Sequence, residues 1–388
     1  MDRDGPVSRG GTFDRQLIVR LVVIALASRL LVLGVAAVAE RSGAPSVTDA
    51  RSASGTQLRQ TDAPLLASLT AWDGFYYVDI ARHGYSAEPV NGPYPNTVFF
   101  PLYPALLRVV HDLSGIDWLV VAVLLSNAAF IAAISLFGVL SMRAVPGRWL
   151  TAVTLLSIAP GGTAFGMAYA DSLFLLLTVA AFVAAEGGAT RATGVLYLLA
   201  TLTRPLGIAL GLPLALLLWL RRGGQPQESR VRALGPLLLG PLGLLGFMAY
   251  QGIVVGDPLA FVHGQAVWSQ GVEVAGSVAA GGGAPDDLAA LSAITGLTVL
   301  VVAVAYTVAA IIYVLRRRDA YGAYAVLGAG APYLVARLVS LDRYLAPVLP
   351  VYWLIARARL PLRLIWGIAS VVILVLLSYL TFRLRLPP

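Results

Sequence analysis

The stretch Trp72-Asp73-Gly74-Phe75-Tyr76-Tyr77-Val78-Asp79-Ile80-Ala81-Arg82-His83-Gly84-Tyr85 combines aromatic, acidic and basic side chains more densely than any other part of the chain. It is too polar to cross a bilayer and too aromatic to be an ordinary solvated loop. Amphipathic rings are favoured at the boundary between membrane and water. We therefore expect this stretch to lie at that boundary, and we interpret it as the active-site loop.

The rest of the chain has the composition of a membrane protein. Of its 388 residues, 58% are hydrophobic and only 12% are charged, and the mean hydropathy is +0.79. The apolar residues form long blocks, whereas a soluble protein of this length would show periodic alternation. The pattern predicts an all-α polytopic membrane protein.

The residue types and the distribution of charge argue against disulfide-rich, zinc-binding and nucleic-acid-binding proteins. Cysteine is absent and histidine occurs three times, which argues against disulfide frameworks and zinc sites. We expect no cofactor and no divalent metal, although carboxylates could hold such an ion. The net charge of +8 comes from basic residues spread over many short loops, without a basic patch, so we expect no nucleic-acid partner.

The chain begins with a polar tail, residues 1–16, which we expect to be cytoplasmic. An apolar span from about Leu17 to Ala39 follows and is long enough to cross a bilayer. A cleaved signal peptide is the alternative, because Ala37-Val38-Ala39 resembles a small-residue cleavage site. The apolar stretch exceeds the ~7 to 15 residues of a signal-peptide core, which favours a retained anchor. Residues 17–388 are then one multi-spanning domain.

A large non-spanning segment, residues 40–118, forms the predicted first outer loop. Arg41 to Pro64 is rich in small and polar residues and is typical of a linker. We expect a short helix from about Leu65 to His83, stopped by Gly84. The apolar, proline-broken stretch from Asn96 to Arg108 is shorter than a span and is expected to lie in the interface.

Eight further apolar blocks follow this loop. They run over Leu119–Met142, Trp149–Ala185, Ala192–Leu220, Leu234–Val255, Leu291–Leu315, Ala320–Val339, Tyr344–Ala356 and Leu364–Leu380. The second and third are too long for one crossing. Each is interrupted near its middle, the second at Ala159-Pro160-Gly161-Gly162 and Tyr169-Ala170-Asp171-Ser172, the third at Thr203-Arg204-Pro205-Leu206-Gly207. Splitting both predicts about eleven transmembrane helices.

Arginine positions predict the orientation. With the N-terminus inside, nearly all arginine clusters fall in inner loops, as the positive-inside rule requires. The loops 40–118 and 256–290 then share the outer face of the plasma membrane. This leaves a set of polar residues that the rule does not explain, all at outer ends of spans or in outer loops: Asp73, Asp79, Arg82, His83, Glu88, Asp171, Arg204, Asp257, Arg337, Asp342 and Arg343. Short, interrupted spans point to a membrane-embedded binding site, so we expect one external site.

These residue types suit one particular chemistry. A glycoside hydrolase needs two facing carboxylates, but Asp73 and Asp79 are six residues apart, which on a helix is a turn of about 600° and separates them. One carboxylate suffices when the leaving group departs as a stabilised anion. A sugar on a lipid phosphate is such a donor: arginine neutralises the phosphate, and an Asp takes the proton of the acceptor hydroxyl. Arginine suits the phosphate because its planar fork bonds two oxygens.

The motifs of the first outer loop resemble those of the PIG-V type mannosyltransferases. The resemblance rests on Trp72-Asp73, Tyr77, Ile80-Ala81, Gly84-Tyr85 and Phe99-Phe100-Pro101-Leu102-Tyr103-Pro104. Later stretches are also similar: Ala168-Tyr169-Ala170-Asp171-Ser172-Leu173-Phe174, with Asp171 in place of the more usual Glu, Thr201-Leu202-Thr203-Arg204-Pro205-Leu206-Gly207, with Leu206 in place of Asn, Gly256-Asp257-Pro258-Leu259-Ala260-Phe261 and Asp342-Arg343-Tyr344. Together they span roughly residues 15 to 355.

The resemblance implies a GT-C fold and a glycosyltransferase. It implies a polyprenyl- or dolichyl-phosphate sugar donor, normally mannose, used on the non-cytoplasmic side. It also implies an inverting displacement with an Asp of the first loop as base, here Asp73. The expected partners are the lipid-phosphate donor, the bilayer and an acceptor that is a glycolipid, glycan or protein.

Each candidate residue also has a structural interpretation. Asp73 is the predicted base or a helix N-cap. Arg204 and Arg343 are predicted to bind the donor phosphate. The alternative is that Arg204 satisfies free carbonyls at the helix break and that Arg343 pairs with Asp342 or Asp171. The other predicted substrate-binding residues are Trp72, Tyr77, Asp79, Arg82, His83, Glu88, Tyr103 and Asp171. For these, a local ion pair, a cap or an aromatic belt at the interface is the alternative.

Two other functions remain open. The donor could carry a sugar other than mannose, because the sequence does not reveal hydroxyl stereochemistry. Alternatively, the chain could transport a lipid-linked sugar, which would predict repeated halves with charges near mid-span. A large aromatic and acidic outer loop is not expected of a transporter.

Overall fold

The computed structural model describes residues 15–42, 60–61, 63–86, 88, 94–267, 286–317, 319–335 and 340–384. These residues fold into helices joined by turns, and no strand occurs among them. The all-helical class predicted from the apolar blocks is therefore confirmed for this part of the chain. The predicted cytoplasmic tail lies almost wholly outside it, as do residues 268–285 of the second outer loop.

The first part of the chain forms α1 (Arg15–Arg41), α2 (Pro64–Leu69), α3 (Asp73–His83), the 3-10 helix η2 (Asn96–Val98), α4 (Leu102–Ser114) and α5 (Trp118–Ala144). The middle of the chain forms α6 (Trp149–Ser157), α7 (Asp171–Glu186), α8 (Thr190–Thr203), η3 (Pro205–Leu210), α9 (Gly211–Arg221), α10 (Gln227–Arg232), η4 (Gly235–Leu238) and α11 (Leu239–Val254). The last part forms α13 (Asp286–Arg316), α14 (Ala320–Gly330), α15 (Pro332–Val335), α16 (Leu341–Leu345), α17 (Leu349–Arg357) and α18 (Leu360–Leu384).

Five described segments are long and apolar enough to cross a membrane. They are α1, α5, the stretch from α10 to the end of α11, most of α13 and α18. The predicted number of about eleven spans is not confirmed, because the remaining apolar blocks fold as shorter helices. Proline, glycine and polar residues inside those blocks interrupt the backbone ladder and end each helix early.

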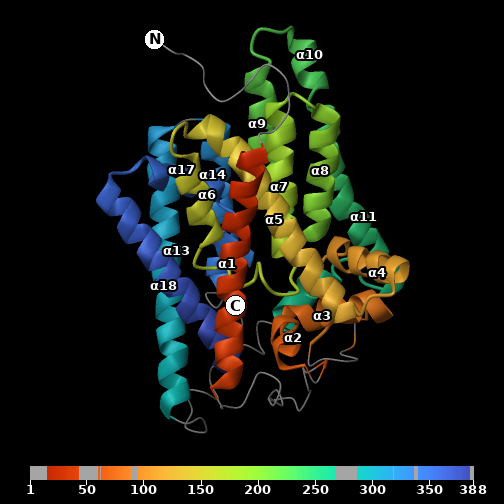
Figure 1. Cartoon of the computed structure of the whole chain (residues 1–388). Helices are drawn as coiled ribbons and strands as arrows, with labels where there is room; N and C mark the ends of the chain where they lie inside the picture. The colour runs from red at the N-terminus through yellow and green to blue at the C-terminus, as the bar shows by residue number, and fades with distance from the viewer. Residues whose placement is uncertain are drawn as a thin grey trace.

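The two long blocks break where the sequence predicted. α6 ends at Ser157 and α7 begins at Asp171, so residues 158–170 form an irregular connection. α8 ends at Thr203, and η3 with Pro205 at its start leads into α9. Figure 1 shows that α6 and α7, and likewise α8 and α9, turn back within the bundle at the level of these breaks. Both breaks bring irregular backbone and polar side chains into the helix bundle.

The helices pack in one continuous bundle. α5 contacts α7, α7 contacts α8, and α8 contacts α11, while α1 packs against α5, α6 and α18. α2, α3 and α4 gather at one end of the bundle, and α10 lies at the other end (Figure 1). At that other end Glu186 accepts hydrogen bonds from Arg221, at 2.7 Å, and from Tyr321, at 3.2 Å. The stretch predicted to be the active-site loop and the helix α10, with Arg230 and Arg232, are therefore at opposite ends.

Candidate active site

The site begins at a break between two short helices. We expected one helix from Leu65 to His83, but α2 ends at Leu69 and α3 begins at Asp73. The break is at Trp72, which has a φ of 57°, a backbone conformation that costs free energy for a residue with a side chain. The predicted stop at Gly84, with a φ of 87°, is present. The break turns the start of α3 toward the interior of the bundle.

Asp73 is not an N-cap. Trp72 occupies the cap position, and Asp73 is the first residue of α3. The Asp73 carboxylate instead accepts a hydrogen bond from Nη1 of Arg343 at 2.7 Å, and the side chains are 19% and 9% exposed respectively. Tyr169 accepts a hydrogen bond from the Asp73 backbone amide at 3.3 Å, and its ring lies 5.2 Å from the Arg343 guanidinium carbon. The structure thus joins the predicted base to a predicted phosphate ligand.

A second ion pair lies close to the first. Nη1 of Arg204, at the end of α8, donates to the carboxylate of Asp171, the first residue of α7. Both side chains are more than nine-tenths buried. An arginine is therefore the partner of Asp171, and its predicted role in substrate binding stays a prediction. The guanidinium carbons of Arg204 and Arg343 lie 4.2 and 5.2 Å from the centre of the Tyr344 ring, so that ring joins the two pairs.

Close backbone contacts hold residues 158–170 against α2, α3 and α16. A Cβ on Gly161 would lie 2.4 Å from the carbonyl oxygen of Asp342, so only glycine lets residues 158–170 approach α16. Gly74 lies against Ala168, where an added Cβ would be 3.3 Å from that side chain. The amide of Ala168 also donates to the carbonyl of Leu69 at 2.8 Å. The irregular connection is thereby fixed against both α2–α3 and α16.

Several buried polar atoms at this site have no hydrogen-bond partner among the residues that the structure describes. They are Nε1 of Trp72, Nε of Arg343 and Oδ1 of Asp342. Burial raises the pKa of Asp342 to about 6, because the ionised carboxylate is poorly solvated there. An unsatisfied buried donor or acceptor costs about 1–3 kcal/mol, so a polar ligand that bonds these atoms would recover that free energy.

Tyr77 and Tyr103 form the apolar side of the site. Tyr77 is buried, and its ring makes edge-to-face contacts with Phe99 and Tyr103 at 4.9 Å. Burial, followed by the charge of Asp73, raises the pKa of Tyr77 well above its usual value. The Tyr103 hydroxyl bonds the carbonyl of Ala122 and the hydroxyl of Ser126, at 2.9 and 2.7 Å. Tyr103 is thus engaged in packing α4 on α5.

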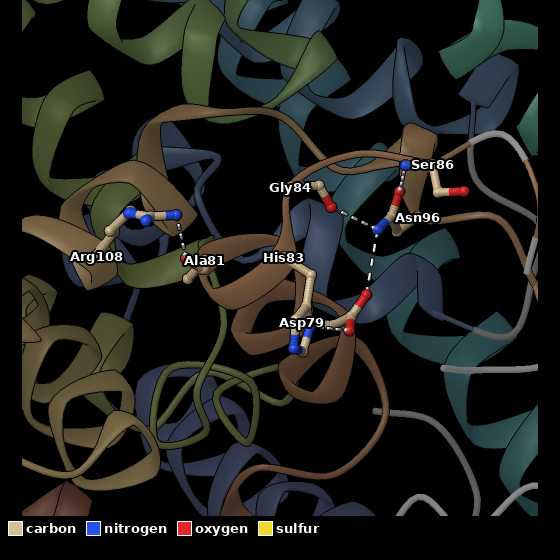
Figure 2. A network of polar contacts seen from close by, with 7 residues as sticks. All are labelled: Asp79, Ala81, His83, Gly84, Ser86, Asn96 and Arg108. Atoms are coloured by element: carbon tan, nitrogen blue, oxygen red, sulfur yellow. Dashed lines mark hydrogen bonds and ion pairs between the residues drawn. The ribbon is translucent and has the colours of Figure 1, made fainter. Parts of the chain in front are cut away.

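Asp79 and His83 brace the outer loop (Figure 2). Oδ1 of Asp79 is 2.9 Å from Nδ1 of His83, and Oδ2 accepts a hydrogen bond from Asn96 at 3.2 Å. Asn96 also bonds the backbone at Gly84 and Ser86. This network ties η2 to the end of α3. The local ion pair that we considered for Asp79 and His83 is present.

The two remaining predicted residues lie at the surface. Arg82 is exposed, with its guanidinium carbon 5.8 Å from the Trp118 ring. Glu88 is exposed as well. Arg337 lies outside the described residues. No group of three or more His, Asp or Glu side chains able to hold a metal ion occurs in the described ranges.

An apolar groove runs beside α3. It has about 1010 Å³ of empty space between α3, α4, the end of α8 and α11. Its wall includes Ile80, Gly84 and Leu202, and the rings of Tyr85, Phe247 and Tyr250, with Arg108 among the lining residues. Leu202 is two residues before Arg204. The groove therefore borders the end of α8, the helix that leads to Arg204.

The sequence did not identify all residues of the site. Tyr169 and Tyr344 lie in motifs that we had noted, but neither had a role, because nothing local shows that their rings contact arginines from other helices. Asn96 was seen only as part of an apolar stretch. The one available signal was the position of Tyr344 directly after Arg343 and of Tyr169 two residues before Asp171.

The comparison with known families places this chain. A sequence model of the mannosyltransferase (PIG-V) family matches residues 16–212, about half of the chain. The chain belongs to the PIG-V mannosyltransferase family. The predicted resemblance is confirmed. The family match includes α3, Asp171 and Arg204, whereas Arg343 lies beyond it.

Three PIG-V relatives carry the name GPI alpha-1,6-mannosyltransferase 2. The protein from Cricetulus griseus is 32% identical over 170 residues, 41% of this chain and 33% of its own length. The proteins from Mus musculus and Homo sapiens are 33% and 30% identical over 156 residues, 37% of this chain and 30% of theirs. The matched region spans about a third of the length of these relatives.

Proposed function

We propose that this PIG-V family member transfers mannose from a polyprenyl-phosphate donor to an acceptor hydroxyl at the extracytoplasmic membrane face. The observation that carries the proposal is the pair of buried Arg–Asp contacts, Arg343 with Asp73 and Arg204 with Asp171, joined by the Tyr344 ring. The names of the relatives support mannose as the sugar.

The two arginines would bind the donor phosphate. Guanidinium groups bind phosphate oxygens through two parallel hydrogen bonds and stay charged in a buried site. Nε of Arg343 has no partner among the described residues and would donate to such an oxygen. A phosphate bound at Nε would share the positive charge of Arg343 with the Asp73 carboxylate, which Nη1 holds.

Transfer then proceeds by a single displacement. The acceptor oxygen forms a bond to the anomeric carbon while the bond from that carbon to the phosphate oxygen breaks. The electron pair of the broken bond leaves with the lipid phosphate, whose charge Arg204 and Arg343 neutralise. The acceptor proton passes to Asp73. Attack opposite the leaving group inverts the configuration at the anomeric carbon.

The apolar groove and Trp72 would bind the lipid chain and the sugar of the donor. The apolar groove along α3 suits the polyprenyl chain, because it leads from Leu202 along the rings of Tyr85, Phe247 and Tyr250. Nε1 of Trp72, without a partner in the described ranges, would donate to a sugar hydroxyl. The transfer would need no divalent metal, since the arginines supply the positive charge that a metal would otherwise provide. Transfer that stops on chelation and resumes with added Mg²⁺ or Mn²⁺ would contradict this last point.

The orientation follows from the arrangement of charge. α2, α3 and α4 lie at the opposite end of the bundle from α10, which carries Arg230 and Arg232 (Figure 1). The positive-inside rule would place the α10 end in the cytoplasm and the active-site loop outside. Labelling of a single introduced cysteine with an impermeant reagent in intact cells would test this, because the chain has no native cysteine.

The deciding experiment compares membranes that contain wild-type protein, Asp73→Asn or Asp112→Asn. Asp112 is the matched control, because it is 58% exposed on α4 and its nearest contact, to Arg108, is 3.8 Å. With radiolabelled polyprenyl-phosphate mannose, Asp73→Asn should lower transfer by about 100-fold or more at equal protein level. Asp112→Asn should match wild type.

The other outcomes are equally informative. An active Asp73→Asn protein would remove Asp73 from the role of base. A wild type that uses other lipid-phosphate sugars, but not the mannose donor, would change the donor sugar. A wild type that releases no lipid phosphate from any such donor would contradict transfer itself and favour transport.

A further inference from the structure

Arg29 is a buried charge that the proposed chemistry does not use. It lies in the middle of α1, one of the candidate membrane spans, and is 3% exposed. No carboxylate in the described part of the chain forms an ion pair with it. A charged side chain at such a depth is costly and is retained where it meets polar partners.

Arg29 bonds one backbone carbonyl at the end of α6 and one in the connection that follows it. Nη1 donates to the carbonyl of Gly162 at 3.0 Å, and Nη2 to that of Ser157 at 3.5 Å. Ser157 is the last residue of α6. The guanidinium also lies 4.0 Å above the Phe130 ring of α5.

The end of α6 at the helix break leaves backbone carbonyls that need hydrogen-bond donors. The last four carbonyls of a helix have no partner within it, and they carry the negative end of the helix dipole. In apolar surroundings, each unsatisfied group costs several kcal/mol. A guanidinium supplies several donors together with a positive charge, so Arg29 provides the carbonyl of Ser157, the last residue of α6, with a partner inside the bundle.

The connection that Arg29 holds also carries the site. Residues 158–170 include Gly161, which contacts the backbone of Asp342, and Tyr169, which contacts both Asp73 and Arg343. Asp171, the partner of Arg204, follows directly. A shift in the path of these residues would therefore move both ion pairs.

We infer that Arg29 is a positioning residue for the transfer reaction: it anchors residues 158–170 so that Tyr169 and Asp171 hold Arg343 and Arg204 in place. This inference rests on the proposed function for its effect on rate. Its structural part, the anchoring, stands independently of that function.

The kinetic test replaces Arg29 with methionine and with lysine, and uses Arg20→Met as the control. Arg20 lies on the same helix and is exposed. A misplacement of about 1 Å can cost about 100-fold in rate, so Arg29→Met should lower kcat by about that factor while the KM for donor changes less. Arg29→Lys should retain more activity than Arg29→Met, because an ammonium still donates to a carbonyl. Arg20→Met should match wild type.

A double-variant cycle separates positioning from general loss of fold. Tyr169→Phe removes a hydroxyl at the site and should lower kcat in the wild-type background. In the Arg29→Met background the same change should cost much less, because Tyr169 is already displaced. Fully additive losses would overturn the inference, as would wild-type kinetics in Arg29→Met.

Amide hydrogen exchange tests the anchoring without any activity. The amides of Gly162, Gly166 and Ala168 donate to backbone carbonyls at 2.8 to 2.9 Å. In detergent-solubilised Arg29→Met and Arg29→Lys, peptides that cover residues 158–170 should exchange faster than in wild type. Peptides of α13 and α14 should not change. Equal exchange over 158–170 would overturn the inference even if the wild type proved to transfer no sugar.

Discussion

Asp73 and Arg343 are 270 positions apart in the chain, and their side chains meet at 2.7 Å. The first comes from the loop that precedes most of the bundle, and the second from a short helix near its end. The contact therefore joins an early and a late part of the chain at the site. It also means that the predicted base is already paired before any donor binds.

Transfer activity should depend on both the positive charge and the planar geometry of the Arg343 guanidinium. Arg343→Lys keeps the positive charge but loses the planar fork, and we expect kcat/KM for the donor to fall about 10-fold. Arg343→Gln loses the charge as well and should fall by about 100-fold or more. Steady-state kinetics with a polyprenyl-phosphate mannose series measures both. Equal activity of the Lys and Gln variants would contradict phosphate binding by Arg343.

The Arg204–Asp171 pair should behave as a buried unit. Arg204→Gln leaves the Asp171 carboxylate buried and unpaired, which should cost about 3–5 kcal/mol of unfolding free energy. Adding Asp171→Asn should restore most of that stability, since no lone charge remains, but not the transfer activity. Unfolding in detergent, followed with a transfer assay on the same samples, separates the two effects. If the double variant is as unstable as the single one, the pair is not what holds α7 and α8 there.

Gly161 should tolerate no side chain. Gly161→Ala would place a Cβ 2.4 Å from the Asp342 carbonyl oxygen, so residues 158–170 or α16 must shift and transfer should fall by about 10-fold or more. Gly34→Ala is the matched control, because its Cβ would meet nothing within 4 Å. The ratio of transfer rates at equal amounts of folded protein measures the effect. Wild-type rates in Gly161→Ala would show that the close approach is not required.

The stability of the fold should depend on pH through the ionisation of Asp342. Burial raises its folded-state pKa to about 6, above the ordinary value of 3.8. A raised pKa means that the folded state binds the proton more tightly than the unfolded state, so this contribution to stability is present at low pH and is lost as the pH rises from about 4 to 6. The difference in unfolding temperature between wild type and Asp342→Asn should therefore widen from pH 5 to pH 7. A constant difference over that range would contradict a buried, titrating Asp342.

Local patterns were sufficient for several features of this protein. The proline and glycine interruptions at residues 159–162 and 203–207 predicted the breaks between α6 and α7 and between α8 and α9, because proline and glycine clustered within an apolar block disfavour a continuous helix. The motif around Trp72-Asp73 led to the family. The count of about eleven spans went beyond such patterns, since an apolar block does not reveal whether it folds as one crossing or as several short helices.

By itself, the sequence determined the chemical character of the protein: a helical membrane chain, with one aromatic and acidic loop and a few arginines that topology does not explain. These properties depend on composition and short-range order, which the chain carries locally. The tertiary structure alone decided which carboxylate meets which arginine, that α3 begins after a strained Trp72, and that Arg29 satisfies the end of α6. Such pairings depend on how helices far apart in the chain pack, and burial then makes each of them energetically important, because a buried charge without a partner is costly.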